Sequence, residues 1–229
     1  MRKSKVTVVT FYGIDGSGKT TLARLLAGIL RKEKMNVYIV RLRAHHTLMY
    51  LLIRFLFWAK GLNYKLAQGR PAYFNYVVKY YFKGGRLYVA LEIVSVLMWL
   101  IVKVLSKRIL CRDHVIFIAD RFIPDFIVML HYTSNLNEST LLKLIKFFER
   151  FMLSFSNVVY FYIHVDPYIA ILRKPEEQLH LRFVTYLSTM YRWIGRYINH
   201  ITINTTNKNP LESVIQIVRY LKLSGVLEA

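Results

Sequence analysis

The chain has 229 residues, of which 55% are hydrophobic, with five prolines and one cysteine, Cys111. This composition is typical of one α/β domain with a substantial core, and it excludes a disulfide-stapled secreted fold and a disordered chain. The formal net charge of +20 favours polyanionic partners, but it does not distinguish nucleotides from nucleic acid or an anionic membrane surface. Because no apolar leader precedes Val6, we expect a cytoplasmic protein.

Apolar runs rich in β-branched residues alternate with segments of helical period along the whole chain. Such alternation is typical of βαβ units, so the sequence predicts a parallel sheet flanked by helices in one domain over residues 1–229. The strands are expected at 6–12, 36–41, 115–119, 158–165 and 200–204.

The first predicted strand is followed by Gly-Ile-Asp-Gly-Ser-Gly-Lys-Thr at residues 13–20, which fits the phosphate-binding loop G-x-x-x-x-G-K-[ST]. Its glycines let backbone N–H groups approach phosphate oxygens, Lys19 can reach the terminal phosphates, and the Thr20 hydroxyl can ligate Mg²⁺. A helix expected from Lys19 to about Lys32 adds the positive end of its dipole. We therefore predict an ATP and Mg²⁺ site, with nucleotide contacts from Gly13, Ile14, Asp15, Gly16, Ser17, Gly18, Lys19, Thr20 and Thr21.

The segment from 42 to 114 contains no convincing strand. Residues 41–112 hold thirteen lysines and arginines, thirteen aromatic residues and a single acid, Glu92. Helices are expected at 48–58, 73–82 and 87–105, of which the last is nearly apolar. Its longest stretch without charge, 93–102, suits a packed core helix better than a membrane span, although the surrounding basic and aromatic residues are also typical of interfacial helices.

The third predicted strand ends in Asp120-Arg121. Open α/β sheets bind ligands at the carboxyl ends of their strands, so these two side chains are expected beside the phosphate-binding loop. The acid can hold Mg²⁺ through water or orient an acceptor, and the guanidinium can bind a phosphate. Further along, 138–155 reads as an amphipathic helix, and Asp166-Pro167 and Asn209-Pro210 predict two helix starts.

Several of these segments resemble the thymidylate kinase family. They are Phe11–Thr21, with an acid at the third position of the loop, Ile118–Phe122, His164–Pro167 with Arg173-Lys174, and Ile203–Thr206 with Pro210–Glu212. The resemblance implies a five-stranded parallel sheet in a three-layer P-loop kinase fold. It also implies transfer of the γ-phosphate of ATP to a nucleoside monophosphate, most simply dTMP.

The resemblance further implies roles for individual residues. Lys19 would stabilise the transferring phosphoryl group, Asp15 would contact the acceptor's sugar, and Asp120 with Arg121 would serve the metal and the acceptor phosphate. A lid at about 168–182 would supply the remaining positive charge, because the phosphate-binding loop has no arginine of its own. Arg173 is the first candidate for that charge, followed by Lys174 and Arg182. The expected catalytic set is Lys19, Asp120, Arg121 and Arg173.

The chain departs from the family where the acceptor binds. The acid-Pro-Gly turn expected after the second strand is replaced by Arg41-Leu-Arg-Ala-His-His-Thr, whose Arg41 and Arg43 are our candidates for acceptor phosphate contacts. The Asp-Arg pair that faces thymine is replaced by Leu91-Glu92-Ile93, within a helical acceptor-binding insert at about 42–114. Neither departure touches the predicted ATP site.

Three functions are therefore open. The first is a nucleoside monophosphate kinase of thymidylate kinase type, acting on small-molecule nucleotides and, as the resemblance implies, forming a homodimer through helices. The second is a P-loop kinase with a different acceptor at a membrane, which the basic and aromatic insert favours through peripheral membrane contact. The third is a nucleic-acid-binding P-loop ATPase, which the charge favours and the lack of any recognisable binding module disfavours.

Overall fold

The computed structural model describes residues 6–42, 86–110, 113–175 and 180–227, with 55, 58, 59 and 61 between them. Within this part of the chain five parallel strands form one sheet in the order β2-β3-β1-β4-β5. Each predicted strand is present to within one residue at either end. The strands are β1 (Val6–Tyr12), β2 (Asn36–Val40), β3 (Val115–Asp120), β4 (Asn157–His164) and β5 (His200–Asn204).

Helices connect the strands, as expected for βαβ units. The helix after the phosphate-binding loop has the predicted bounds, and the amphipathic helix predicted at 138–155 ends two residues early. The helices are α1 (Lys19–Lys32), α5 (Arg86–Leu100), a π-helical turn (Ile101–Leu105), α6 (Ser106–Leu110), α7 (Ile123–Ser134), α8 (Glu138–Leu153), α9 (Pro167–Leu172), α10 (Leu181–Gly195) and α11 (Pro210–Leu223). The helices predicted at 48–58 and 73–82 lie largely outside the described residues.

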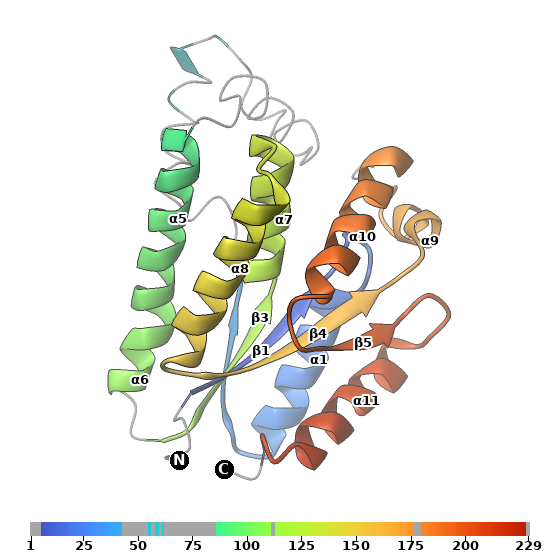
Figure 1. Cartoon of the computed structure of the whole chain (residues 1–229). Coiled ribbons are helices and arrows are strands. Elements are labelled where there is room, and N and C mark those ends of the chain that lie inside the picture. The colour runs from blue at the N-terminus through green and yellow to red at the C-terminus, as the bar shows by residue number, and fades with distance from the viewer. Residues whose placement is uncertain are drawn as a thin grey trace.

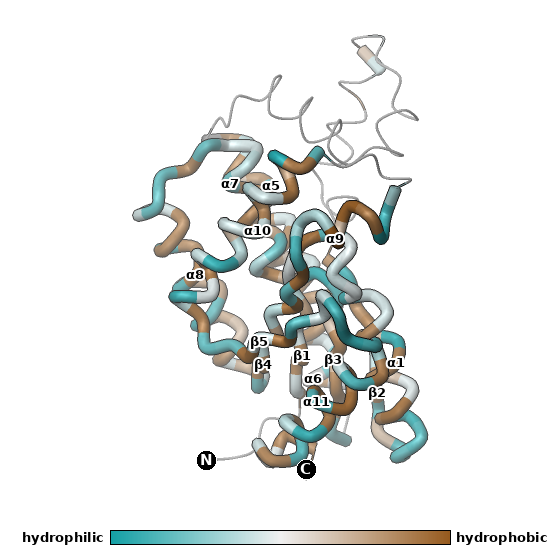
Figure 2. The backbone as a smooth tube through the Cα atoms, turned by 90° about the vertical axis from the view of Figure 1, so that its right-hand side faces the viewer, coloured by the Kyte–Doolittle hydropathy of each residue, from teal (hydrophilic) through white to brown (hydrophobic). Residues whose placement is uncertain are grey.

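Successive side chains of a strand point to opposite faces of the sheet, and helices bury both faces. In β1, Val8 and Tyr12 enter a core shared with α5, α7, α8 and α10, whereas Val9 and Phe11 enter a second core shared with α1 and α11. The fold is therefore three-layered, with these two sets of helices on either side of the sheet (Figure 1). Figure 2 shows α8 alternating between hydrophilic and hydrophobic residues, as expected of a helix with one face on the core.

The two helix starts predicted from Asp-Pro and Asn-Pro pairs are confirmed. The Asp166 side chain accepts a hydrogen bond from the N–H of Tyr168 at 2.8 Å at the start of α9, and Asn209 accepts one from the N–H of Leu211 at 3.0 Å at the start of α11. These caps fix where the chain leaves β4 and β5, on the same edge of the sheet as the phosphate-binding loop.

Helix α5 packs on the sheet by one side only. Val96 and Leu100 are fully buried, whereas the opposite side exposes apolar residues along its whole length and into α6. The run Leu87–Leu105 is long and apolar enough to cross a membrane by length and composition, a test that the core helices of many soluble proteins also pass, and 39% of it is buried. The prediction of a packed core helix is therefore right for the inner face and wrong for the outer one.

The order of the strands determines what meets at the carboxyl edge. β1 is central, with β3 and β4 as its neighbours, and Phe11 of β1 lies level with Asp120 of β3. The loop after β1 therefore lies between the residues that follow β3 and those that follow β4, which is the usual place for a ligand in an open α/β sheet.

Candidate active site

Glycines shape the loop between β1 and α1. Gly13, Gly16 and Gly18 have φ angles of 142°, 83° and 93°, a region that residues with a Cβ rarely adopt. A Cβ on Gly13 would fall against the carbonyl oxygen of Ile163 in β4, and one on Gly16 against the backbone of Ala170 in α9. The loop is thus pressed between strand and helix, with α1 beginning directly behind it.

Lys19 lies inside the cradle that this loop forms. Its side chain is 5% exposed, and its Nζ donates hydrogen bonds to the carbonyl oxygens of Gly13 and Ile14 at 2.5 and 2.7 Å. Nζ also lies 3.9 Å from a carboxylate oxygen of Asp15. Burial lowers the pKa of Lys19, and the charge of Asp15 acts against that shift. This buried ammonium, held by two carbonyl groups, the Ser17 hydroxyl at 3.5 Å and the nearby carboxylate, can offer its donors to a phosphate that enters the loop.

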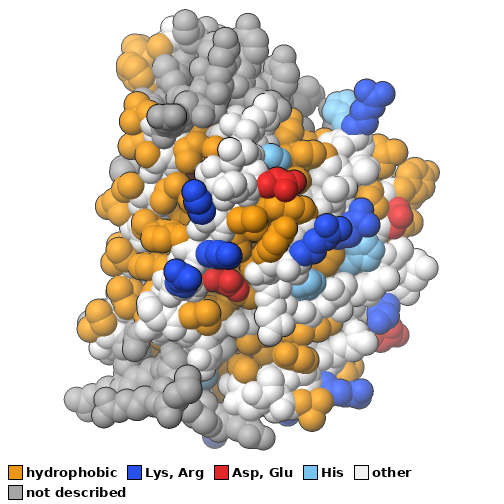
Figure 3. All heavy atoms as spheres, viewed as in Figure 1, with side chains coloured by type: hydrophobic (Ala, Val, Ile, Leu, Met, Phe, Trp, Pro, Cys, Tyr) orange, Lys and Arg blue, Asp and Glu red, His pale blue; other side chains and the backbone are white. Residues whose placement is uncertain are grey.

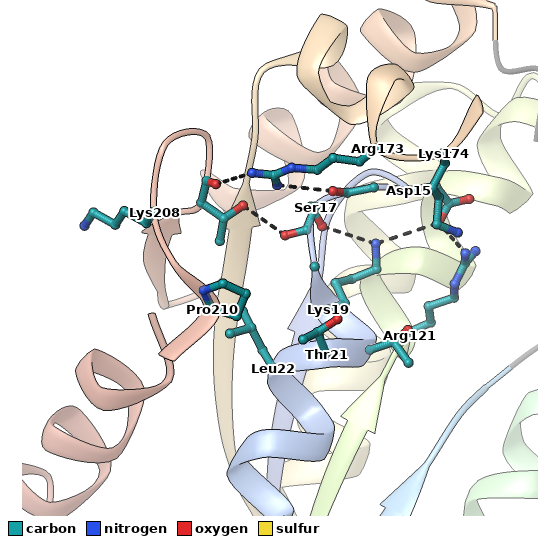
Figure 4. A pocket seen from close by; sticks show the side chains of 14 residues that line it. Asp15, Ser17, Lys19, Thr21, Leu22, Arg121, Arg173, Lys174, Lys208 and Pro210 are labelled. Carbon is teal, nitrogen blue, oxygen red and sulfur yellow. Dashed lines mark hydrogen bonds and ion pairs between the residues drawn. The ribbon is translucent and has the colours of Figure 1, made fainter. Parts of the chain in front are cut away.

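Arg121 follows β3 in a left-handed backbone conformation, with φ of 67°. Its backbone N–H donates to the carbonyl of Phe11 at 3.2 Å, and its own carbonyl accepts from the N–H of Leu42 at 3.1 Å. This turn therefore links the ends of three neighbouring strands and points the guanidinium at Asp15, with which it forms an ion pair (Figure 4).

Asp125 supports this pair from the first turn of α7. It is 5% exposed, accepts from the backbone N–H of Phe122 at 3.2 Å and accepts from the hydroxyl of Tyr191 in α10 at 2.8 Å. Burial raises the pKa of Asp125 to about 6, while Lys19 and Arg121 act in the opposite direction. The cluster thus joins α7 and α10 to the loop after β1.

A second cluster lies around Thr20, the first polar residue after Lys19 in α1. The Thr20 hydroxyl donates to Oδ2 of Asp120 at 2.7 Å, and Arg41, directly after β2, donates to both of these groups, at 2.6 Å to the threonine oxygen. Asp120 is 2% exposed, and its other carboxylate oxygen has no hydrogen-bond partner among the residues that the structure describes. A hydroxyl and a carboxylate are oxygen ligands of the kind that Mg²⁺ takes, and the unpartnered oxygen of Asp120 is available to accept one more bond. Thr20 and Asp120 therefore fit the expected metal.

Arg173 lies just after α9, at the start of the segment predicted as a lid. Its guanidinium donates to the carbonyl oxygens of Thr205 and Thr206 at 2.7 and 3.0 Å and, more weakly, to that of Gly16 at 3.4 Å. The hydroxyl of Thr205 in turn donates to the carbonyl of Ser17 at 2.9 Å. The residues after β4 and β5 are thereby fastened to the phosphate-binding loop (Figure 4).

Several of these groups line a cavity of about 370 Å³. Its walls come from the loop and the first turn of α1, from Arg121 after β3, from the residues after α9, and from the residues after β5. The lining residues are Asp15, Gly16, Ser17, Gly18, Lys19, Thr20, Thr21, Leu22, Arg121, Arg173, Lys174, Thr205, Lys208 and Pro210.

Most of the residues singled out in the sequence meet at this cavity, from three segments of the chain: Lys19, Arg121 and Arg173 line it, and Asp120 lies beside it, bonded to Thr20. Arg43 lies outside the described residues, as does part of the lid, 176–179. The first part of that lid is the short helix α9, and Arg182 is exposed in α10 and does not line the cavity. Arg41 does not stand free for an acceptor, since it is bonded to Thr20 and Asp120.

Sequence reasoning gave no role to Asp125, Tyr191 or Thr205. Asp125 lies three residues after Phe122, the residue that precedes α7. An acid at this spacing is a helix-start pattern, which could have identified Asp125 from the sequence. Thr205 lies in the segment Ile203–Thr206, which carries part of the family resemblance and could have marked it, whereas no local signal marks Tyr191, whose partner Asp125 is 66 residues away.

A five-stranded parallel sheet, a phosphate-binding loop after its central strand and an Asp-Arg pair after the neighbouring strand define a P-loop kinase fold. No protein-family model and no curated protein sequence matches the chain. Among solved structures it is similar to the thymidylate kinase from Ehrlichia chaffeensis, with 21% identity and a TM-score of 0.50, over 94% of this chain and 98% of that one. At this identity the similarity shows a shared fold.

Proposed function

We propose that the protein is an ATP-dependent nucleoside monophosphate kinase of thymidylate kinase type, converting dTMP and ATP to dTDP and ADP. The observation that carries the proposal is the meeting of Lys19, Asp15 and Arg121 at one wall of the cavity. A kinase of this class needs a loop for the donor phosphates directly beside an arginine for the acceptor phosphate. The fold shared with the thymidylate kinase from Ehrlichia chaffeensis also supports it.

On the donor side, the loop's N–H groups and the start of α1 bind the phosphates of ATP, and Lys19 transfers its hydrogen bonds from loop carbonyls to the β- and γ-phosphates. Thr20 and Asp120 would hold Mg²⁺, which would neutralise charge on the phosphate oxygens. Catalysis then depends on positioning and on positive charge around the migrating group, and little covalent chemistry is required of the protein.

On the acceptor side, Arg121 binds the phosphate of the monophosphate and Asp15 contacts its sugar. The fork of a guanidinium matches two phosphate oxygens, so Arg121 orients the attacking oxygen as well as attracting it. The ion pair between Asp15 and Arg121 holds both side chains at the loop before the acceptor arrives. Asp125, which accepts a hydrogen bond from Tyr191, supports Arg121 through its charge.

The lid supplies further positive charge. Arg173 and Lys174 both line the cavity, which supports them over Arg182 as the source of that charge. Arg173 is bonded to three carbonyl oxygens, so it reaches the transferring group only if these bonds are released. Lys174 is therefore the second candidate for the catalytic charge.

The test is turnover of ATP to ADP with Mg²⁺ in the presence of a panel of nucleoside monophosphates, followed by chromatography of the products. We expect dTMP, or a closely related monophosphate, to stimulate ADP release and to appear as the diphosphate. If no monophosphate in the panel stimulated ADP release, the proposal would be overturned. Stimulation by polynucleotides alone would favour an ATPase that acts on nucleic acid.

The outer face of α5 and α6 supports a homodimer. Leu87, Val94, Met98, Ile101, Val102 and Ile109 are 46% to 75% exposed and form one stripe. Figure 3 shows hydrophobic side chains gathered along this edge of the molecule. Apolar surface of this extent is usually covered by a partner. The same stripe favours the second candidate, a P-loop kinase whose acceptor is at a membrane.

Light scattering on the purified protein separates these two. We expect a dimer that Met98→Glu dissociates, whereas Leu211→Glu, on the exposed side of α11, leaves it intact. A monomer that sediments with anionic vesicles in a salt-dependent manner would instead support the membrane-associated kinase.

A further inference from the structure

Arg41 lies where a cation is expected to bind. Its Nη2 lies 2.6 Å from the Thr20 hydroxyl oxygen and is ion-paired with Oδ2 of Asp120, the two groups that fit Mg²⁺. The side chain of Arg41 is 29% exposed and that of Asp120 is 3% exposed, so the guanidinium approaches a buried carboxylate from the solvent side.

The guanidinium and a metal ion exclude each other at this position. An arginine keeps its charge at any physiological pH and has no lone pair to offer a metal. A dication placed between the same two oxygens would meet a fixed positive charge in direct contact. Metal binding between the Thr20 oxygen and Oδ2 of Asp120 therefore requires that Arg41 move away.

The backbone next to Arg41 is anchored, so any change in what Arg41 contacts has to come from its side chain. The next residue, Leu42, is 7% exposed and donates its N–H to the carbonyl of Arg121 at 3.1 Å. The side chain of Arg41 therefore extends from a backbone position next to Arg121, the residue proposed to bind the acceptor phosphate. A phosphate bound at Arg121 offers the guanidinium of Arg41 a second anion, with the two-oxygen geometry that its fork prefers.

We propose that Arg41 is a resident cation that holds the metal position in the substrate-free protein and leaves it for the acceptor phosphate, which couples acceptor binding to metal binding. This inference rests on the proposed function, because it assigns Thr20 and Asp120 to the metal and Arg121 to the acceptor. The coupling prevents the metal site from forming fully until a phosphate acceptor is present.

The size of the effect follows from simple competition. If the guanidinium occupies the site in nearly all substrate-free molecules, the apparent metal affinity falls in proportion to the small fraction in which the site is open. We expect a loss of about tenfold to a hundredfold in affinity relative to a protein without the arginine.

The first experiment is a titration with Mn²⁺ alone, followed by electron paramagnetic resonance, on the nucleotide-free protein. We expect Arg41→Gln to bind Mn²⁺ at least tenfold more tightly than the unmodified protein. Arg24→Gln, which removes the same charge from the exposed side of α1, should bind Mn²⁺ as the unmodified protein does. Equal affinities in all three proteins would overturn the proposal. Adding Asp120→Asn to Arg41→Gln should abolish the gain, and a gain that survives would also overturn it.

The second experiment adds the acceptor to the same titration. Addition of dTMP, or of whichever monophosphate binds, should tighten Mn²⁺ binding by the unmodified protein and leave the affinity of Arg41→Gln unchanged. An unchanged affinity in the unmodified protein, with the monophosphate shown to bind by calorimetry, would overturn the coupling. Failure of the proposed function would look different from failure of this inference. No monophosphate would support turnover, but the Mn²⁺ titration of Arg41→Gln would still measure the competition between Arg41 and the metal ion.

Discussion

The two sides of the site are built in different ways. On the donor side the phosphate-binding loop is confined by backbone, with β4 behind Gly13, α9 behind Gly16 and Thr205 bonded to Ser17. On the acceptor side the contacts are ion pairs between long side chains, Arg121 with Asp15 and Arg41 with Asp120. Backbone contacts leave one arrangement, whereas charged side chains can exchange partners. We infer that the donor half is preorganised and that the acceptor half rearranges when substrate binds.

Lys19→Met should have the largest effect and tests the donor side directly. It removes a cation aimed at the transferring phosphate and leaves the apolar length of the side chain. We expect turnover to fall roughly a hundred- to a thousandfold, the size seen when one preorganised donor to a transition state is lost. Initial rates at saturating ATP and acceptor measure the effect. Lys32→Met, at the exposed end of the same helix, is the matched control and should keep its rate. A Lys19→Met protein with full turnover would remove the basis of the donor site.

Glu92→Gln tests α5, the described helix of the predicted acceptor-binding insert. Glu92 is 5% exposed in α5, near the hydroxyl of Tyr88, and burial raises its pKa from an ordinary 4.5 to about 7. Between these values the folded state holds a proton that the unfolded state has lost, so stability falls as pH rises from 4.5 to 7. A glutamine side chain does not ionise, so it avoids the cost of placing a buried negative charge at high pH. We expect the variant to be more stable by about 3 kcal/mol at pH 8 and nearly unchanged at pH 4.

Denaturant unfolding at both pH values measures this difference. Glu138→Gln, at an exposed position in α8, should change the free energy of unfolding by less than about 1 kcal/mol at either pH. A gain for Glu92→Gln that is equal at pH 4 and pH 8 would show that the carboxyl group does not titrate with the raised pKa.

Arg121→Lys sharpens the comparison at the acceptor. The charge remains, but the two-oxygen fork and its fixed geometry at Asp15 are lost. We expect the KM for the acceptor to rise about tenfold while the KM for ATP stays within about twofold, since one bidentate contact differs from a point charge by roughly 1.4 kcal/mol. Steady-state kinetics with each substrate varied in turn give both values. A rise in the KM for ATP alone would move Arg121 to the donor side.

The sequence was sufficient for the parts of the molecule whose signals are local. Strand bounds followed from apolar runs, the helix starts at Asp166 and Asn209 from their following prolines, and the donor loop from its glycines and Lys19. The position of Asp120 and Arg121 beside that loop followed from the rule that strand ends meet at one edge of a parallel sheet. Each of these inferences needs only neighbours along the chain or a general rule of topology.

The rest depended on pairings that no spacing encodes. Arg41 was predicted to face an acceptor phosphate, but it bonds to Thr20 and Asp120, 21 and 79 residues away along the chain. The outer face of α5 could not be told from its inner face, because apolar residues occupy both. Arg173 was expected to point at the transferring group, and its carbonyl partners come from a loop after β5. Which partner a long side chain chooses is decided by tertiary geometry.

Thr205→Val has the smallest expected effect and tests whether the donor side is held by its backbone contacts. The Thr205 hydroxyl is buried and donates to the carbonyl oxygens of Ser17 at 2.9 Å and of His164 at 3.1 Å, and valine keeps the shape of the side chain without this donor. Loss of one buried hydrogen bond costs about 1 kcal/mol, so the melting temperature should fall by about 2–4 °C. Thr202→Val, at an exposed position in β5, should leave it unchanged. If the donor half is preorganised as we infer, Thr205→Val also raises the KM for ATP more than the KM for the acceptor. The reverse order would mean that the loop after β1 is held from the acceptor side.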